Sequence, residues 1–216
     1  MRESLDQKRR RVREIIKRFQ KRMPHPECAL HHTNPGELLV ATILSAQCTD
    51  ERVNIVTKTL FKKYPSIQAF ADAKHSELEQ DIRSTGFYKN KARNIIAAAR
   101  SIVTEHGGQV PSTIEALVEL PGVGRKTANV VLGNAFGIAS GVVVDTHVTR
   151  LSCRLALSKG KTAEAIEEEL NDLIPKRHWV NFSHWLILHG RGVCKARKPN
   201  CDGCFLNDIC PKLGVI

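Results

Sequence analysis

The chain has 216 residues, enough for one or two domains with a hydrophobic core. Its net charge of +11 predicts attraction to a polyanion, and only 5% of its residues are aromatic, few for a protein that stacks single-stranded bases. The basic N-terminal segment lacks the apolar stretch of a signal peptide, and no apolar run reaches the roughly 20 residues of a bilayer span. We therefore expect an intracellular, cytoplasmic protein that binds duplex nucleic acid and no membrane.

The first predicted element is a basic amphipathic helix over residues 2–22. Ten of these residues are Lys or Arg, yet apolar side chains recur on one helical face. These apolar residues are Val12, Ile15, Ile16, Phe19 and Met23. A basic tail would lack such a stripe, so we expect a docked helix whose charged face contacts either water or DNA.

A largely buried helix is predicted over residues 38–44, which are nearly all apolar. Asn34 and Pro35 precede it with the residue types of an N-cap and a first helical turn. Asp50 is predicted to cap the next helix, and Pro65 cannot continue that helix.

Two capping-box signatures predict the starts of further helices. They are Ser76-x-x-Glu79 and Ser112-x-x-Glu115. A short helical pattern covers 66–73, and a longer one covers 92–103 until the glycines at 107–108 end it. Residues 84–88 are typical of a loop.

Residues 117–128 have the pattern of a helix, a tight glycine turn and a second helix. Pro121 cannot continue the first helix, while Gly122 and Gly124 permit backbone angles that other residues resist. Such a turn presents unpaired N–H groups at a helix N-terminus, and this arrangement suits a phosphate. Lys126 lies in the first turn of the second helix.

The valines at 142–144 favour a strand by propensity, but no other segment has the character to pair with them. We therefore expect a buried extended link or the approach to a helix, with Asp145 directly after it. Helices are predicted over 146–157, after a cap at Thr162, and over 181–189. The predicted fold class is all-α.

Four of the seven cysteines lie in the last 23 residues, a crowding that predicts metal ligation in a reducing compartment. They are Cys194, Cys201, Cys204 and Cys210. Prolines and a glycine exclude a helix there, so the loop can fold around a centre. Four thiolates suit either tetrahedral zinc or a four-iron cluster, and chemistry alone does not choose. We expect the other three, Cys28, Cys48 and Cys153, to be buried or incidental thiols.

The glycine turn, Lys126, the spaced Asp145 and the cysteine spacing together resemble the helix-hairpin-helix DNA glycosylases, and most closely the endonuclease III family. The resemblance covers nearly the whole chain. It implies a six-helix barrel domain over 28–138 and a second helical domain made of 1–27 plus 139–216, with a DNA-binding cleft between them. It also implies a [4Fe–4S] cluster on the four C-terminal cysteines.

This resemblance implies a base-excision-repair enzyme that removes oxidised or ring-saturated pyrimidines from duplex DNA and then cleaves at the abasic site by β-elimination. Lys126 would attack the sugar and form a Schiff base, and Asp145 would stabilise the cationic sugar. The expected partner is double-stranded DNA with damaged bases or abasic sites, and we expect a monomer.

The family fills the gap left by a flipped nucleotide with a glutamine, here Gln47, and with a residue of a Gly-Leu-Tyr loop, here Phe87. The predicted DNA contacts are Gln47, Phe87, Gly122, Val123, Gly124, Lys195, Arg197 and Lys198. Phenylalanine in place of leucine keeps an apolar wedge-like group.

Two other functions are compatible with parts of this pattern. A monofunctional adenine or mismatch glycosylase would share the turn, the aspartate and the cluster, but would lack a lysine at position 126. The adenine-specific kind also carries a further C-terminal domain, whereas this chain ends six residues after Cys210. A non-catalytic DNA-binding protein would use only the glycine turn and the basic surface.

Overall fold

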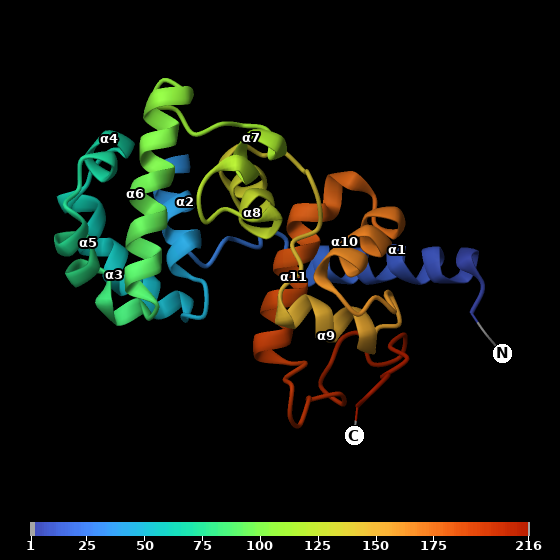
Figure 1. The fold of residues 1–216 in the computed structure, drawn as a ribbon. Helices are drawn as coiled ribbons and strands as arrows, with labels where there is room; N and C mark the ends of the chain where they lie inside the picture. Colours follow the sequence, from blue (N-terminus) through green and yellow to red (C-terminus); the bar gives the residue numbers. More distant parts are fainter. Residues whose placement is uncertain (1–2, 216) are drawn as a thin grey trace. The chain divides into compact units, whose positions relative to one another are not determined.

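The computed structural model describes residues 3–215. The predicted N-terminal helix over 2–22 and the predicted second domain therefore each extend slightly beyond the described residues, at positions 1, 2 and 216. This range contains eleven α-helices, two short 3-10 helices and no strand, which confirms the all-α class (Figure 1). Among these helices, none combines the length and the apolar character needed to cross a membrane.

The described chain forms two compact units, each with its own apolar core. One, which we call the hairpin unit, is Cys28–Ile138. The other, which we call the cysteine unit, joins the residues up to Glu27 to those from Ala139 onward.

The hairpin unit is built around a central buried helix. Its helices are α2 (Pro35–Leu44), α3 (Asp50–Lys63), α4 (Ile67–Ala71), α5 (His75–Asp81), η1 (Arg83–Thr85), α6 (Tyr88–Glu105), α7 (Ile114–Glu119) and α8 (Arg125–Ala135). Helix α2 contacts α3, α6 and α8, and its residues from Leu38 to Leu44 are all buried, as predicted. Helices α4 and α5 pack on α6.

The cysteine unit contains fewer helices and a long irregular C-terminal segment. Its helices are α1 (Leu5–Arg22), α9 (Thr146–Arg154), α10 (Ala163–Leu173), η2 (Lys176–His178) and α11 (Trp179–Gly192). The predicted apolar face of α1 is confirmed, because Val12, Ile15, Ile16 and Phe19 are buried and Met23 is partly buried. The ring of Phe19 stacks on Trp185 of α11 with 5.7 Å between centroids.

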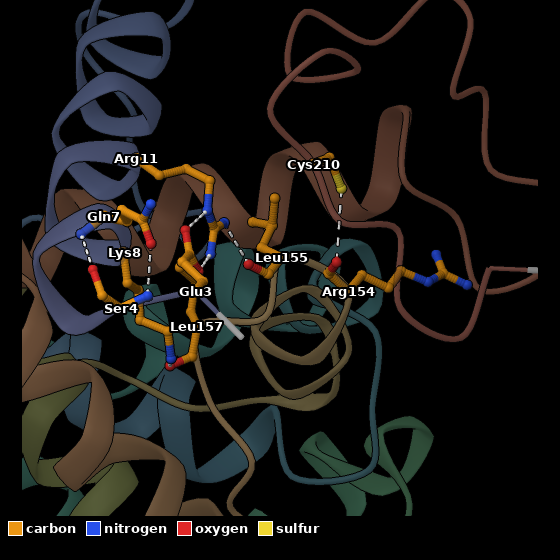
Figure 2. Close-up of polar contacts among 9 residues, drawn as sticks. All are labelled: Glu3, Ser4, Gln7, Lys8, Arg11, Arg154, Leu155, Leu157 and Cys210. Atoms are coloured by element: carbon orange, nitrogen blue, oxygen red, sulfur yellow. Dashed lines mark hydrogen bonds and ion pairs between the residues drawn. The ribbon is translucent and has the colours of Figure 1, made fainter. Parts of the chain in front are cut away.

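The basic face of α1 binds other parts of the same unit. Arg11 pairs with Glu3 at 2.7 Å and donates to the Leu155 carbonyl oxygen at 2.6 Å (Figure 2). Arg18 pairs with Asp208 in the C-terminal segment. Part of the charged face predicted to contact water or DNA therefore ties this helix to its own unit.

The predicted caps at Asp50, Ser76 and Ser112 are wrong. Thr49 caps α3 and Thr113 caps α7, each one residue away from the prediction, and α5 begins after Lys74 without a side-chain cap. Neighbouring hydroxyl and carboxyl residues are all acceptable caps by type. The choice depends on which residue has extended backbone angles, and Thr49 and Thr113 do.

Candidate functional site

The glycine turn between α7 and α8 forms as predicted and leaves the start of α8 open. The Val123 N–H donates to the Leu120 carbonyl oxygen at 3.0 Å, and both of these side chains are buried. The predicted DNA contact of Val123 therefore cannot come from its side chain. Gly124 is the N-cap of α8 and makes no side-chain cap bond.

The two glycines of this turn have different physical roles. Gly122 has a φ of +78°, and a Cβ there would lie 2.7 Å from the Cβ of Asn94 on α6, so the turn requires glycine. A Cβ on Gly124 would meet nothing within 4 Å. Gly124 therefore leaves room beside the N–H groups at the start of α8, where an anion can approach.

Lys126 is the second residue of α8, and its side chain is exposed. The structure therefore presents a primary amine beside the open helix N-terminus, as the sequence predicted.

Both predicted wedge residues lie in loops of the hairpin unit. Gln47 follows α2 and Phe87 precedes α6, and both are exposed, Phe87 to 62%. Both have left-handed backbone angles, with φ of +54° at Gln47 and +47° at Phe87. Such angles are costly for residues other than glycine, so the surrounding structure must hold these two loops in place.

In the cysteine unit, the buried valines at 142–144 form an extended link without strand pairing, which was one of the two expected arrangements. The Val142 N–H donates to Asn171 Oδ1 at 3.0 Å, and the Val143 N–H donates to Ser183 Oγ at 2.8 Å. Side chains of α10 and α11 thus replace the hydrogen bonds that a neighbouring strand would have supplied.

This link delivers Asp145 to the start of α9, where it is the N-cap. Asp145 Oδ1 accepts hydrogen bonds from the N–H groups of His147 and Val148, both at 2.8 Å. These bonds hold the carboxylate in one orientation. The other carboxylate oxygen, Asp145 Oδ2, takes part in neither of these two bonds. Helix α9 ends at Arg154 and is shorter than the predicted 146–157.

His147, two residues after Asp145, takes part in a hydrogen-bond network at the start of α9. Burial lowers its pKa and so favours the neutral imidazole, whose Nδ1 can accept a hydrogen bond from Arg150 Nη2, 3.1 Å away. The same guanidinium donates to the Gly190 and Cys194 carbonyl oxygens at 2.9 and 3.1 Å. Arg150 therefore joins α9 to the end of α11 and to the first cysteine of the loop.

The four C-terminal cysteines line one hollow, together with apolar residues of α9 and the loop. Burial and the neighbouring cysteines raise the pKa values of the Cys204 and Cys210 thiols, so four thiolates would require bound cations there. Within residues 3–215, no group of three or more His, Cys, Asp or Glu side chains is arranged to hold a metal ion. Four cysteine thiolates are the donor set of a four-iron cluster and also suit tetrahedral zinc, so the residue types alone do not choose between the two.

Arg154 ties both ends of this loop to α9. Its side chain is buried, and Nη1 lies 3.2 Å from Cys194 Sγ and 2.7 Å from the Lys195 carbonyl oxygen. Its own carbonyl oxygen accepts from the Leu213 N–H at 3.1 Å and lies 3.7 Å from Cys210 Sγ (Figure 2). Neither Arg150 nor Arg154 was predicted from the sequence, because two arginines spaced four apart on a helix are equally typical of an exposed face.

The remaining predicted DNA contacts are three basic residues between the first two cysteines of the loop. Lys195, Arg197 and Lys198 are all exposed. The two predicted catalytic residues belong to different units, Lys126 to the hairpin unit and Asp145 to the cysteine unit.

Comparison with protein families gives two matches. Residues 40–176 match the HhH-GPD superfamily of base excision DNA repair proteins, and residues 194–210 match the iron-sulfur binding domain of endonuclease III. The second match begins and ends at the first and last cysteine of the loop.

Proteins of similar sequence match this chain over nearly their whole length. Endonuclease III of Synechocystis sp. is 54% identical over 94% of this chain and 93% of its own, and that of Escherichia coli is 43% identical over 91% and 93%. A structure of a trapped endonuclease III–DNA covalent intermediate has a TM-score of 0.89 at 44% identity, covering 94% of this chain and 96% of its own. A thermostable thymine-DNA glycosylase has a TM-score of 0.83 at 26% identity, covering 95% and 96%.

The glycine turn can be tested with one substitution at each glycine. Gly122→Ala should lower the free energy of unfolding by about 1–3 kcal/mol, because alanine is strained at positive φ and its Cβ meets Asn94. Gly124→Ser should fold at least as stably, because serine is a good N-cap, yet should weaken duplex binding because its side chain occupies the open space. Denaturant unfolding and fluorescence anisotropy measure the two effects. Wild-type stability of Gly122→Ala would contradict the requirement for glycine.

The cysteine hollow can be tested by metal analysis. The wild-type protein should contain about four iron and four sulfide per chain. Cys201→Ala should lose this iron and lose amide protection over residues 193–215 in hydrogen exchange, while the hairpin unit keeps its protection. Cys153→Ala is the matched control, because Cys153 is exposed and does not line the hollow. Stoichiometric zinc in the wild type would contradict the cluster.

Proposed function

This chain belongs to the endonuclease III family of base-excision-repair DNA glycosylases, and on that premise we propose which of its residues remove the damaged base and cut the strand. The protein is a DNA glycosylase and abasic-site lyase that binds DNA and carries a [4Fe–4S] cluster. The proposed substrates, inside the cell, are oxidised or ring-saturated pyrimidines and abasic sites in duplex DNA, on which a single chain would act.

The observation that carries the proposal is the Lys126 amine, exposed in the first turn of α8 beside the glycine turn. The N–H groups at the start of α8 would bind a backbone phosphate of the damaged strand. The same contact would place the sugar near Lys126. The exposed Lys195, Arg197 and Lys198 would add contacts to other phosphates.

The chemistry begins when the damaged nucleotide leaves the stack, at a cost of a few kcal/mol. Gln47 and Phe87 would enter the space that it vacates. The neutral amine of Lys126 then forms a bond to C1′ while the glycosidic bond breaks and the base leaves with the electron pair. Asp145 would stabilise the positive charge that develops on the sugar through Oδ2, the carboxylate oxygen that accepts neither cap bond.

The covalent product opens to an iminium between Lys126 and C1′. The iminium makes the C2′ hydrogen acidic, so its removal expels the 3′ phosphate and cleaves the strand. Water then releases the lysine. The proposed role of the bound cluster is structural: it holds the four cysteines together and so orders a loop whose few apolar groups would not fold alone.

Covalent trapping tests the role of Lys126. Borohydride added during reaction with abasic-site duplex should reduce the iminium and yield a stable protein–DNA adduct, which Lys126→Ala should abolish. Lys62→Ala is the matched control, because Lys62 is an exposed lysine at the end of α3. The adduct is measured by denaturing electrophoresis. An adduct that persists in Lys126→Ala would contradict the assignment.

Asp145 can be tested separately from its role as a helix cap. Asp145→Asn should keep the cap, because its amide oxygen can accept the same two N–H groups, so stability should change by less than about 0.5 kcal/mol. Base release should nevertheless fall by roughly 10²–10⁴-fold, because the carboxylate charge is lost. Asp145→Ala should lose activity and also about 1 kcal/mol of stability. Full single-turnover activity of Asp145→Asn would refute the catalytic role.

A further inference from the structure

Lys91 on α6 is buried in the hairpin unit, with only 5% of its surface exposed. Lysine is almost never buried to this extent without a compensating partner. Burial lowers the pKa of its amino group. Among the described residues, its side-chain hydrogen bonds go to two backbone carbonyl oxygens rather than to a carboxylate. Core packing alone does not explain why a lysine, rather than an apolar residue, occupies this buried position.

The two carbonyl oxygens belong to the two loops that carry the predicted wedge residues. Lys91 Nζ donates to Leu44 O, at the end of α2, and to Thr85 O, at the end of η1, both at 2.8 Å. Leu44 is three residues before Gln47, and Thr85 is two residues before Phe87. One nitrogen atom therefore fixes the starting points of both loops relative to each other.

Lys91 also contacts the second loop through its main chain. Its backbone N–H donates to the Phe87 carbonyl oxygen at 3.1 Å, the hydrogen bond that begins α6. Lys91 thus bonds this loop at Thr85 and again at Phe87, the residue with a φ of +47°. Two bonds to one loop and one to the other form a rigid connection between segments far apart in the sequence.

The chemistry of the ammonium group suits this connection. It offers three donors in a tetrahedral arrangement, so two can reach carbonyl oxygens of different segments. Leu44 O lies at the C-terminus of α2, where intrahelical donors run out and the helix dipole favours a positive charge. An apolar residue at position 91 would pack, but it would leave both loops without this link.

We propose that Lys91 is a positioning residue that holds Gln47 and Phe87 in one relative geometry, so that both side chains can enter the space left by a flipped nucleotide. This inference rests on the wedge roles assigned to those two residues in the proposed function. Both residues sit in strained left-handed conformations, which persist only where neighbouring structure holds them. A wedge already held in position loses little conformational entropy when it enters the duplex.

Lys91→Met tests this proposal, because methionine has a similar length and no donor. The lyase rate is measured by borohydride trapping on an abasic site in duplex and in single-stranded DNA. The single strand has no stacked gap to fill, so wedge geometry matters only in the duplex. The duplex rate should fall about tenfold while the single-strand rate stays within about twofold of wild type. Equal loss on both substrates would overturn the proposal, because it would indicate a general folding defect.

Double substitutions test whether Lys91 acts through the wedges. Gln47→Ala and Phe87→Ala should each lower the duplex rate in the wild-type background, and should add little to Lys91→Met. Full additivity would overturn the positioning role. If neither wedge variant affects the duplex rate, the wedge assignment fails and this inference fails with it, while trapping by Lys126 would still support the proposed chemistry.

Two controls separate positioning from loss of stability or charge. Ile102→Ala removes a fully buried side chain from the far end of α6, and Lys62→Met removes an exposed positive charge from the same unit. Both should keep the wild-type ratio of duplex to single-strand rates. Lys91→Gln is neutral and polar, and should give the same duplex-specific loss if Lys91→Met does not fold. A wild-type ratio in Lys91→Gln would overturn the proposal.

Discussion

Buried backbone N–H and C=O groups must find partners, and because residues 3–215 contain no strand, side chains supply partners for the irregular segments. In the cysteine unit, Asn171 and Ser183 bond the link at 142–143. In the cysteine loop, Arg154 donates to the Lys195 carbonyl oxygen. In the hairpin unit, Lys91 donates to the carbonyl oxygens of Leu44 and Thr85. Without these polar side chains, the backbone groups that they bond would lose these hydrogen-bond partners.

The two proposed catalytic residues both lie at the starts of helices. Asp145 caps α9 through one carboxylate oxygen, which accepts both cap hydrogen bonds. Lys126 lies at the start of α8, where the glycine turn leaves the helix without a side-chain cap and therefore open to a phosphate. Each unit thus holds one of the two proposed catalytic residues, and in each the residue lies at the start of a helix.

Local patterns were reliable where neighbouring residues decide the conformation. The buried helix at 38–44, the apolar face of α1 and the glycine turn were all predicted from spacing and residue type, and all are confirmed. The caps at Asp50, Ser76 and Ser112 were wrong, because adjacent residues of similar type compete and the path of the chain chooses between them. The valines at 142–144 were predicted as a buried extended link or the approach to a helix, because no other segment has the character to pair with them, and they form the link.

The residue types and spacings along the chain were sufficient to identify the family, its helical class and its iron–sulfur cofactor, and to nominate four cysteines, a lysine and an aspartate for the site. They could not identify Lys91, Arg150 or Arg154, because nothing in their local surroundings distinguishes them from the many exposed basic residues of this chain. Their roles arise from burial against carbonyl groups distant in sequence. Such contacts exist only after the helices have packed. Only the tertiary structure therefore shows which basic side chains bond to these distant carbonyl groups.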